Sequence, residues 1–182
     1  MIIVHRIPTN LVASGVLVFG LFYSAEVTQA ADEVMLVNAQ TGKCLTIAGG
    51  VSTDNNVTAL QYNCDTHPSR RWRMNQMSGR NIYQIQNVQT GKCLTIAGGV
   101  STDNNVTALQ YDCDTHPSRS WRMNQMNGGN IYQIQNAQTG KCLTIAGGVS
   151  TDNNVEALQY DCDSHPSRRW AIRSGTGTRI DD

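Results

Sequence analysis

Apolar and polar residues alternate over short stretches of this chain. Residues 82–86 read Ile-Tyr-Gln-Ile-Gln, the period-two pattern of a strand with one buried face. Residues 92–96 and 106–113 follow as two more strands between turn-forming stretches, and residues 121–123 begin a fourth. No stretch after residue 30 shows a helical period with caps. The pattern therefore predicts an all-β protein.

This four-strand pattern occurs three times with a period of 49 residues. The segment from Asn38 to Gly50 recurs with one substitution from Asn87, and unchanged from Asn136. Residues 38–86 and 87–135 differ at five positions. Repetition at a fixed period indicates units that bury a shared core. Three units of four strands predict twelve strands.

The N-terminal 30 residues read as an export signal. His5 and Arg6 form a weakly basic start, residues 11–23 are an apolar run, and residues 28–30 offer small side chains for cleavage. The run is shorter than the roughly 20 residues that cross a bilayer. A buried core helix is the alternative. We expect residues 1–30 to be removed and the mature chain to be secreted into an oxidising compartment.

Charge and cysteine content narrow the class of partner. The chain has 14 Lys and Arg residues against 14 Asp and Glu, so it lacks the basic excess typical of proteins that bind nucleic acid or anionic membranes. Its six cysteines include no C-x-x-C pair, which disfavours a zinc site. Catalysis needs an asymmetric set of groups, whereas almost every polar residue here occurs in three equivalent settings. We expect no enzyme activity, no cofactor, no metal, no nucleic acid partner and no membrane insertion.

Three short motifs recur in the same order in each unit. Lys-Cys-Leu marks the second strand, Gln-Tyr-x-Cys ends the third, and the fourth carries Trp72, Trp121 or Trp170. In these motifs the chain resembles the ricin-type lectin domain, also called carbohydrate-binding module family 13. The resemblance implies a β-trefoil domain over 31–182, with repeats at about 34–82, 83–131 and 132–173 and a short polar tail at 174–182. A β-propeller would need at least about four units.

Three-fold repetition also selects one pairing of the cysteines. Each unit has two cysteines 20 residues apart, and ricin-type domains carry a bridge within their repeats. Each closed loop should stabilise the fold by about 3 kcal/mol in the chain-entropy model. The expected disulfides are Cys44–Cys64, Cys93–Cys113 and Cys142–Cys162.

Ricin-type domains bind sugar in a shallow pocket of each repeat. In the family an Asp follows Cys-Leu, an aromatic residue near the end of the third strand stacks on the sugar, and an Asn-Gln pair precedes the tryptophan. This chain keeps the aromatic residue as tyrosine, but has Thr at the Asp position and Ser-Arg at the Asn-Gln pair. The candidate sugar-binding residues, with a nearby Asp and His added, are Thr46, Tyr62, Asp65, His67 and Arg70; Thr95, Tyr111, Asp114, His116 and Arg119; and Thr144, Tyr160, Asp163, His165 and Arg168.

Several of these positions also have a structural interpretation. Tyr62 shares its face of the strand with Leu60, so it could pack in the core instead. Arg70 could pair with Asp65 as a clamp, and the histidine before each proline is by default a turn residue. The loop 52–56 adds a carboxylate and two amides, which are typical of hairpin turns as well.

The resemblance implies a secreted lectin with up to three equivalent sugar sites, whose partners are glycans on cell surfaces or in polysaccharides. A β-trefoil proteinase inhibitor, or the sugar-binding subunit of a toxin or hydrolase assembly, is the alternative. Paired arginines would favour neutral sugars and unpaired ones acidic sugars. Asn56-Val57-Thr58 and Asn105-Val106-Thr107 are N-glycosylation sequons, whereas the third copy has Glu156 in place of threonine.

Overall fold

The computed structural model describes residues 33–127 and 129–175, so the predicted export signal lies outside the described residues. Within these ranges the chain forms twelve strands and three single-turn 3₁₀ helices, which confirms the predicted all-β class. The strands are β1 (Glu33–Asn38), β2 (Cys44–Ile47), β3 (Ala59–Tyr62), β4 (Trp72–Gln76), β5 (Ile82–Asn87), β6 (Cys93–Ile96), β7 (Val106–Tyr111), β8 (Trp121–Gln125), β9 (Ile131–Asn136), β10 (Cys142–Ile145), β11 (Ala157–Tyr160) and β12 (Trp170–Ser174). The 3₁₀ helices are η1 (Pro68–Arg70), η2 (Pro117–Arg119) and η3 (Pro166–Arg168).

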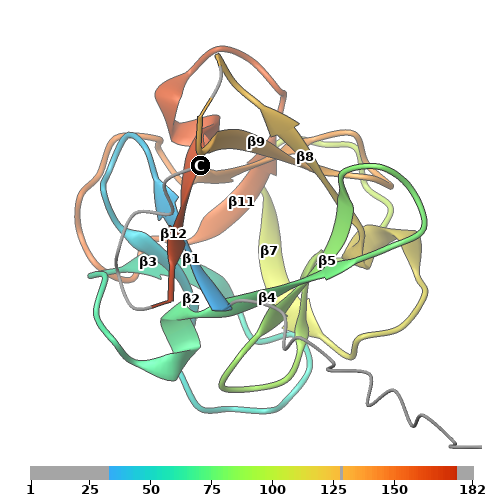
Figure 1. Cartoon of the computed structure of the whole chain (residues 1–182), viewed down its shortest axis with the longest axis horizontal. Coiled ribbons are helices and arrows are strands. Elements are labelled where there is room, and N and C mark those ends of the chain that lie inside the picture. The colour runs from blue at the N-terminus through green and yellow to red at the C-terminus, as the bar shows by residue number, and fades with distance from the viewer. Residues whose placement is uncertain (1–32, 128, 176–182) are drawn as a thin grey trace, which may run out of the picture.

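Six of the strands close into a ring. β1 pairs with β12 and β4, β4 with β5, β5 with β8, β8 with β9, and β9 returns to β12, all antiparallel. The other six form the hairpins β2–β3, β6–β7 and β10–β11, which meet through β7–β11 pairing and through the bridges Thr58–Leu109 and Leu60–Glu156. Figure 1 shows the resulting lobes around one centre. A six-stranded barrel joined to three hairpins is the predicted β-trefoil.

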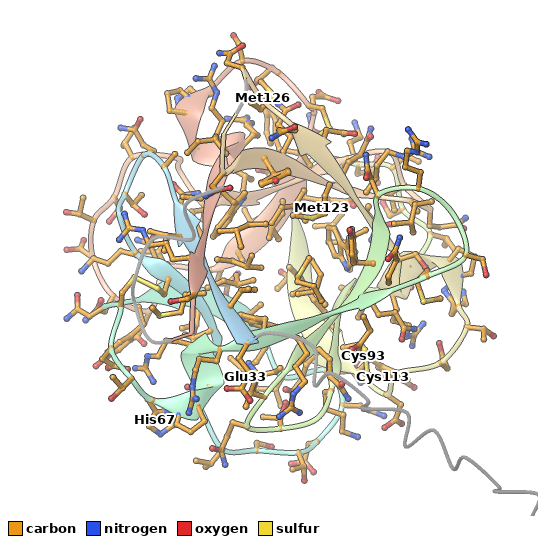
Figure 2. All side chains as sticks on the ribbon, viewed as in Figure 1. Glu33, His67, Cys93, Cys113, Met123 and Met126 are labelled. Atoms are coloured by element: carbon orange, nitrogen blue, oxygen red, sulfur yellow. A yellow bond between two sulfur atoms is a disulfide. The ribbon has the colours of Figure 1, made fainter. Side chains whose placement is uncertain are left out.

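The three tryptophans lie in the packed core. Trp72, Trp121 and Trp170 are fully buried, and each indole Nε1 donates to a leucine carbonyl oxygen of its own repeat at 3.0, 2.9 and 3.0 Å. Met123, which Figure 2 shows toward the middle of the molecule, belongs to the same cluster. The Leu-x-Ile pairs complete it with Leu45, Ile47, Leu94, Ile96, Leu143 and Ile145. The repeats therefore share one core, which a single repeat could not form alone.

One disulfide within each repeat joins the start of the second strand to the loop after the third. The bonds are Cys44–Cys64, Cys93–Cys113 and Cys142–Cys162, with Cα atoms 5.0 Å apart in each. The predicted pairing is confirmed, and three disulfides indicate an oxidising environment. Among the described residues, no helix has the length and apolar character needed to cross a membrane.

Candidate functional site

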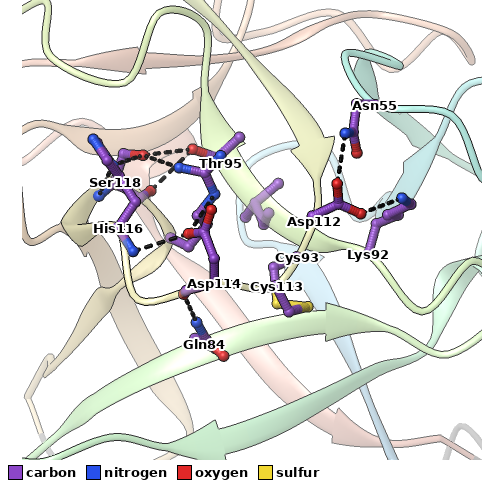
Figure 3. Close-up of polar contacts among 12 residues, drawn as sticks. Asn55, Gln84, Lys92, Cys93, Thr95, Asp112, Cys113, Asp114, His116 and Ser118 are labelled. Atoms are coloured by element: carbon purple, nitrogen blue, oxygen red, sulfur yellow. Dashed lines mark hydrogen bonds and ion pairs between the residues drawn. A yellow bond between two sulfur atoms is a disulfide. The ribbon is translucent and has the colours of Figure 1, made fainter.

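Each repeat has a hollow between its hairpin, its Gly-Gly turn and its 3₁₀ helix. We name these hollows the first, second and third pockets, after the repeats that supply Tyr62, Tyr111 and Tyr160. Their volumes are about 400, 390 and 240 Å³. Threonine, leucine, tyrosine, histidine and arginine from equivalent positions line all three. Figure 3 shows the polar contacts around the second pocket.

Pocket-facing side chains alternate with core-facing ones along the hairpin strands. On β7, Ala108 belongs to the core and Gln110 is fully buried, whereas Leu109 and Tyr111 line the second pocket. On β6, Thr95 lines the same pocket. The alternative in which the tyrosine packs in the core is wrong, because the leucine that shares its face points to the pocket as well.

The arginine of each pocket is held by three neighbours. The guanidinium of Arg119 lies over the Tyr111 ring, 4.4 Å from its centroid, and Nη1 donates to Ser118 Oγ at 3.3 Å. Its Nε lies 3.2 Å from Asp114 Oδ1, an ion pair in which the buried Nε–H is not aimed at an acceptor. Equivalent contacts join Arg70 to Tyr62 and Asp65, and Arg168 to Tyr160 and Asp163. The arginine therefore pairs with the aspartate, as in the structural interpretation of the sequence, and it covers one face of the ring.

His116 is the N-cap of η2 and also lines the pocket. Its Nδ1 accepts from the backbone N–H of Ser118 at 3.2 Å and lies 2.8 Å from Ser118 Oγ. These contacts assign the proton of the neutral ring to Nε2, which is then a donor. Gly99, at φ 74°, allows the turn to approach, since a Cβ there would lie 3.3 Å from His116 Cε1. The histidine is a turn residue, as expected by default, and a pocket residue at once.

Thr95 and Asp114 support the walls of the pocket. Thr95 is buried, and its Oγ1 lies 3.2 Å from the carbonyl oxygen and 3.0 Å from the hydroxyl of Ser118. Asp114 accepts the backbone N–H of His116 at 2.9 Å, and its carbonyl oxygen accepts from Gln84 Nε2 at 2.5 Å (Figure 3). Thr95 thus ties the pocket floor to η2, and Asp114 belongs to the support of the pocket rather than to its lining.

Each pocket takes one wall from another repeat. Asn56 of the first repeat lines the second pocket, Asn105 of the second lines the third, and Asn154 of the third lines the first. The sequence did not indicate which repeat the loop 52–56 contacts. The loop 52–56 reaches the second repeat because the residues at its end, 56–58, pair with β7 of that repeat. This pairing between repeats depends on the closed three-fold fold.

We name the loop that another repeat supplies to a pocket its borrowed wall; for the second pocket this is the loop 52–56. A buried glutamine holds this loop in place. Gln110 Nε2 donates to the carbonyl oxygens of Ser52 and Asp54, both at 2.8 Å, and Oε1 accepts from Thr90 Oγ1 at 2.8 Å. Backbone bonds of 2.9 Å between Gln110 and residues 56–57 complete the attachment. The signal available in the sequence was an amide at a core-facing strand position, because a buried polar group needs partners. The equivalent residues are Gln61 and Gln159.

A second set of contacts, which we name the latch, holds the loop 52–56 through the side chain of Asp112. Asn55 Nδ2 donates to Asp112 Oδ2 at 2.8 Å, and Lys92 Nζ donates to Asp112 Oδ1 (Figure 3). The hydrogen bond from Asn55, followed by that from Lys92, lowers the pKa of Asp112 below its ordinary value. The same arrangement joins Asn104 and Lys141 to Asp161. In the first repeat the position is Asn63, whose Oδ1 accepts from Lys43 Nζ, so this latch has no carboxylate.

The chain is similar in structure to several solved proteins. The designed three-fold symmetric protein ThreeFoil matches with a TM-score of 0.71 and 23% identity, over 77% of this chain and 96% of that one. The Rhizoctonia solani agglutinin matches with a TM-score of 0.69 and 17% identity, over 82% and 99%. An exo-β-1,3-galactanase from Clostridium thermocellum matches with a TM-score of 0.73 and 22% identity, over 79% of this chain and 30% of its own. At these identities the likeness shows the fold alone.

The sequence itself matches one family. No curated protein sequence matches the chain. The family described as ricin-type beta-trefoil lectin domain-like matches residues 21–111, 69–153 and 117–181. These stretches overlap and include the tyrosine, histidine and arginine of every pocket. The chain therefore belongs to the ricin-type β-trefoil lectin-like family.

Proposed function

We propose that the chain is a secreted carbohydrate-binding protein with three sugar sites, the first, second and third pockets. The observation that carries the proposal is that each pocket places a tyrosine and a leucine beside hydrogen-bonding groups from two repeats. A sugar ring has aliphatic hydrogens on its faces and hydroxyl groups at its edge, so it needs both kinds of contact. Membership of a lectin-like family supports the same proposal.

The second pocket offers each kind of contact at a defined place. Leu109 and the part of the Tyr111 ring that the guanidinium leaves uncovered supply apolar surface. His116 Nε2–H donates to a sugar hydroxyl oxygen, and the Asn56 amide both donates and accepts. Because Asn56 comes from the first repeat, the site is complete only when the repeats are closed against one another.

The charge balance of the pocket favours neutral sugars. Arg119 lies against Asp114 and stacks on Tyr111, so an acidic sugar would have to compete with a carboxylate already in place. We therefore expect an affinity that changes little with salt concentration. A single shallow site gains little net free energy from hydroxyl groups that leave water, and is weak. Three linked sites on a glycan-covered surface raise the apparent affinity by about 10²–10⁴.

Attachment to a larger assembly is a second candidate role. The fold spans only 30% of the galactanase chain, so there it is one part of a longer enzyme. In such an assembly this chain would supply sugar binding and a separate partner the chemistry. The three-fold equivalence of its polar residues supports binding rather than catalysis in either case.

The test is a glycan array probed with the purified mature protein, followed by calorimetry with the best monovalent sugar. We expect a stoichiometry near three, which falls by one with Tyr111→Ala and stepwise further when Tyr62→Ala and Tyr160→Ala are added. Tyr111→Phe separates the contribution of the ring from that of the hydroxyl. Gln89→Ala, an exposed change outside the pocket linings, is the control and should leave the stoichiometry unchanged.

Two results would contradict the proposal. Failure to bind any glycan on the array is one. The other is a stoichiometry that stays the same after Tyr111→Ala, which would place the sugar site elsewhere on the chain.

A further inference from the structure

Two of the three borrowed asparagines lie in N-glycosylation sequons. Asn56 is followed by Val57 and Thr58, and Asn105 by the same pair of residue types, whereas Asn154 is followed by Val and Glu156. Asn56 is the residue that the first repeat contributes to the second pocket, and Asn105 is the residue that the second repeat contributes to the third. The sequence motif for glycan attachment and the candidate sugar pocket therefore meet at one side chain.

The geometry of Asn56 suits an attached glycan. Its side chain is exposed and makes no hydrogen bond to residues 33–127 or 129–175, so attachment at Nδ2 costs no contact within that part of the chain. Its backbone is fixed, with φ at 66° and its N–H bonded to the Gln110 carbonyl oxygen at 2.9 Å. The neighbouring Asn55 does not suit a glycan. Its Nδ2 donates to Asp112, and it does not begin a sequon.

We propose that Asn56 and Asn105 are N-glycosylated when the chain passes through a secretory pathway that performs this modification, and that each glycan closes the pocket of the following repeat. In the transfer, Nδ2 bonds to the anomeric carbon of an oligosaccharide from a lipid-linked donor. The lipid diphosphate leaves and Nδ2 loses one proton. The first sugar is then covalently fixed at the rim of a pocket of about 390 Å³ in the second repeat and about 240 Å³ in the third.

The first pocket stays open in the modified protein. Its borrowed wall is Asn154, which lacks a sequon because Glu156 replaces the threonine. Glycosylation therefore converts a protein with three open pockets into one with a single open pocket, beside Tyr62. This consequence for sugar binding rests on the proposed function, whereas the attachment sites and the closure of the pockets do not.

The experiment compares the full-length chain secreted by a eukaryotic host with its Thr58→Val/Thr107→Val variant from the same host, which keeps both asparagines but lacks both sequons. Intact mass and peptide mapping report attachment at Asn56 and Asn105. Nitration of tyrosine by tetranitromethane reports access to the pockets, because Tyr62, Tyr111 and Tyr160 fall on the distinct tryptic peptides 44–70, 93–119 and 142–168. We expect several-fold slower nitration of Tyr111 and Tyr160 in the glycosylated protein and an unchanged rate at Tyr62.

Two variants make the cyclic order testable. Thr58→Val removes the first sequon and leaves Asn56 in place, so it should restore nitration of Tyr111 alone. Glu156→Thr adds a third sequon, so it should slow nitration of Tyr62. A glycan at Asn56 that protects Tyr62 instead of Tyr111, equal nitration with and without glycans, or unmodified Asn56 and Asn105 in such a host would each overturn the proposal.

Neither mass nor nitration requires a sugar ligand, so the result stands apart from the lectin proposal. If the chain also binds sugar, calorimetry should give a stoichiometry near one for the glycosylated protein and near three for the variant without sequons. A stoichiometry of three in the fully glycosylated protein would show that the glycans leave the pockets open. Absence of sugar binding in both forms, together with the expected nitration pattern, would contradict the proposed function alone.

Discussion

The first and second pockets contain the same side chains, but their borrowed walls are held differently. At the second pocket, Asp112 accepts hydrogen bonds from Asn55 and a lysine. At the first, Asn63 occupies the equivalent position, and Lys43 Nζ donates to the side-chain oxygens of both Asn63 and Asn153. A charged latch thus joins the first repeat to the second, and a weaker one joins the third repeat back to the first.

The loop that carries the clamping aspartate is also supported differently. In the second repeat Gln84 on β5 donates to the Asp114 carbonyl oxygen. The equivalent residue on β1 is Met35, whose sulfur lies 3.8 Å from Cys44 Sγ. Near-identical repeats therefore do not give identical sites, because the supports of a pocket come from residues outside its own lining.

The largest effect is expected from the buried glutamine, Gln110 at the second pocket and Gln61 at the first, that holds the loop supplied by another repeat. Gln110→Leu leaves the Thr90 hydroxyl and two backbone carbonyls of the loop 52–56 without their buried partner. We expect the free energy of unfolding to fall by about 1–3 kcal/mol, measured by urea denaturation. Sugar stoichiometry should fall by one at the same time.

The matched variant is Gln61→Leu, which should cost a similar free energy but disable the first pocket instead. The exposed change Gln89→Ala should stay within about 0.5 kcal/mol of the wild type. If Gln110→Leu is as stable as the wild type, the glutamine does not fix the borrowed wall.

An intermediate effect is expected from exchanging the two latches. Asp112→Asn should speed hydrogen exchange at the Asn56 amide, which bonds to the Gln110 carbonyl oxygen, because the loop loses its carboxylate anchor. Asn63→Asp should slow exchange at the Asn154 amide, since Lys43 gains an ionic partner. Unchanged exchange at both amides would show that the latch contributes nothing to the wall.

The smallest effect is expected from pH. Hydrogen bonds from Asn55 and then Lys92 lower the pKa of Asp112, so the folded chain binds this proton less tightly than the unfolded chain. The contribution to stability is complete above the ordinary Asp pKa of about 3.9, and is lost as the pH falls through the lower folded value. Exchange at the Asn56 amide, corrected for its intrinsic pH dependence, should therefore rise in acid.

The first pocket supplies the control for this experiment. Asn63 does not titrate, so exchange at Asn154 should lack the corresponding step. A step of equal size at both amides would mean that Asp112 is not its source.

The fold was predictable from the sequence because its determinants recur at fixed spacing. The tryptophans, the Leu-x-Ile pairs and the cysteines each fall 49 residues apart, and burial or bonding follows from residue type. The tyrosine, histidine and arginine of each pocket were found in the same way. For the tyrosine, the resemblance to the family gave the position, whereas the alternation along the strand left open whether the ring faces a sugar or the core.

Contacts between repeats were not predictable in this way. Asn56 and Gln110 belong to different repeats, and their bond depends on how the hairpins meet in the closed trefoil. Asp114 was predicted to bind sugar because it follows a cysteine beside the pocket. The sequence offered the ion pair with Arg119 as an alternative, but it did not show that the carboxylate also accepts the backbone N–H of His116. Local pattern fixes which residues are near a site, whereas three-dimensional closure fixes which of them remain available.

The cyclic borrowing of walls also sets an order of assembly. Gln110 reaches back to carbonyl groups 58 and 56 residues earlier, so the second pocket has both walls once two repeats have been synthesised. Gln61 must wait for carbonyl groups 89 and 91 residues later in the chain. Contacts between residues far apart in sequence form slowly, and synthesis delivers the N-terminal part first. The pocket that begins earliest along the polypeptide therefore needs the longest sequence separation between its two walls, and it closes only when the third repeat is present.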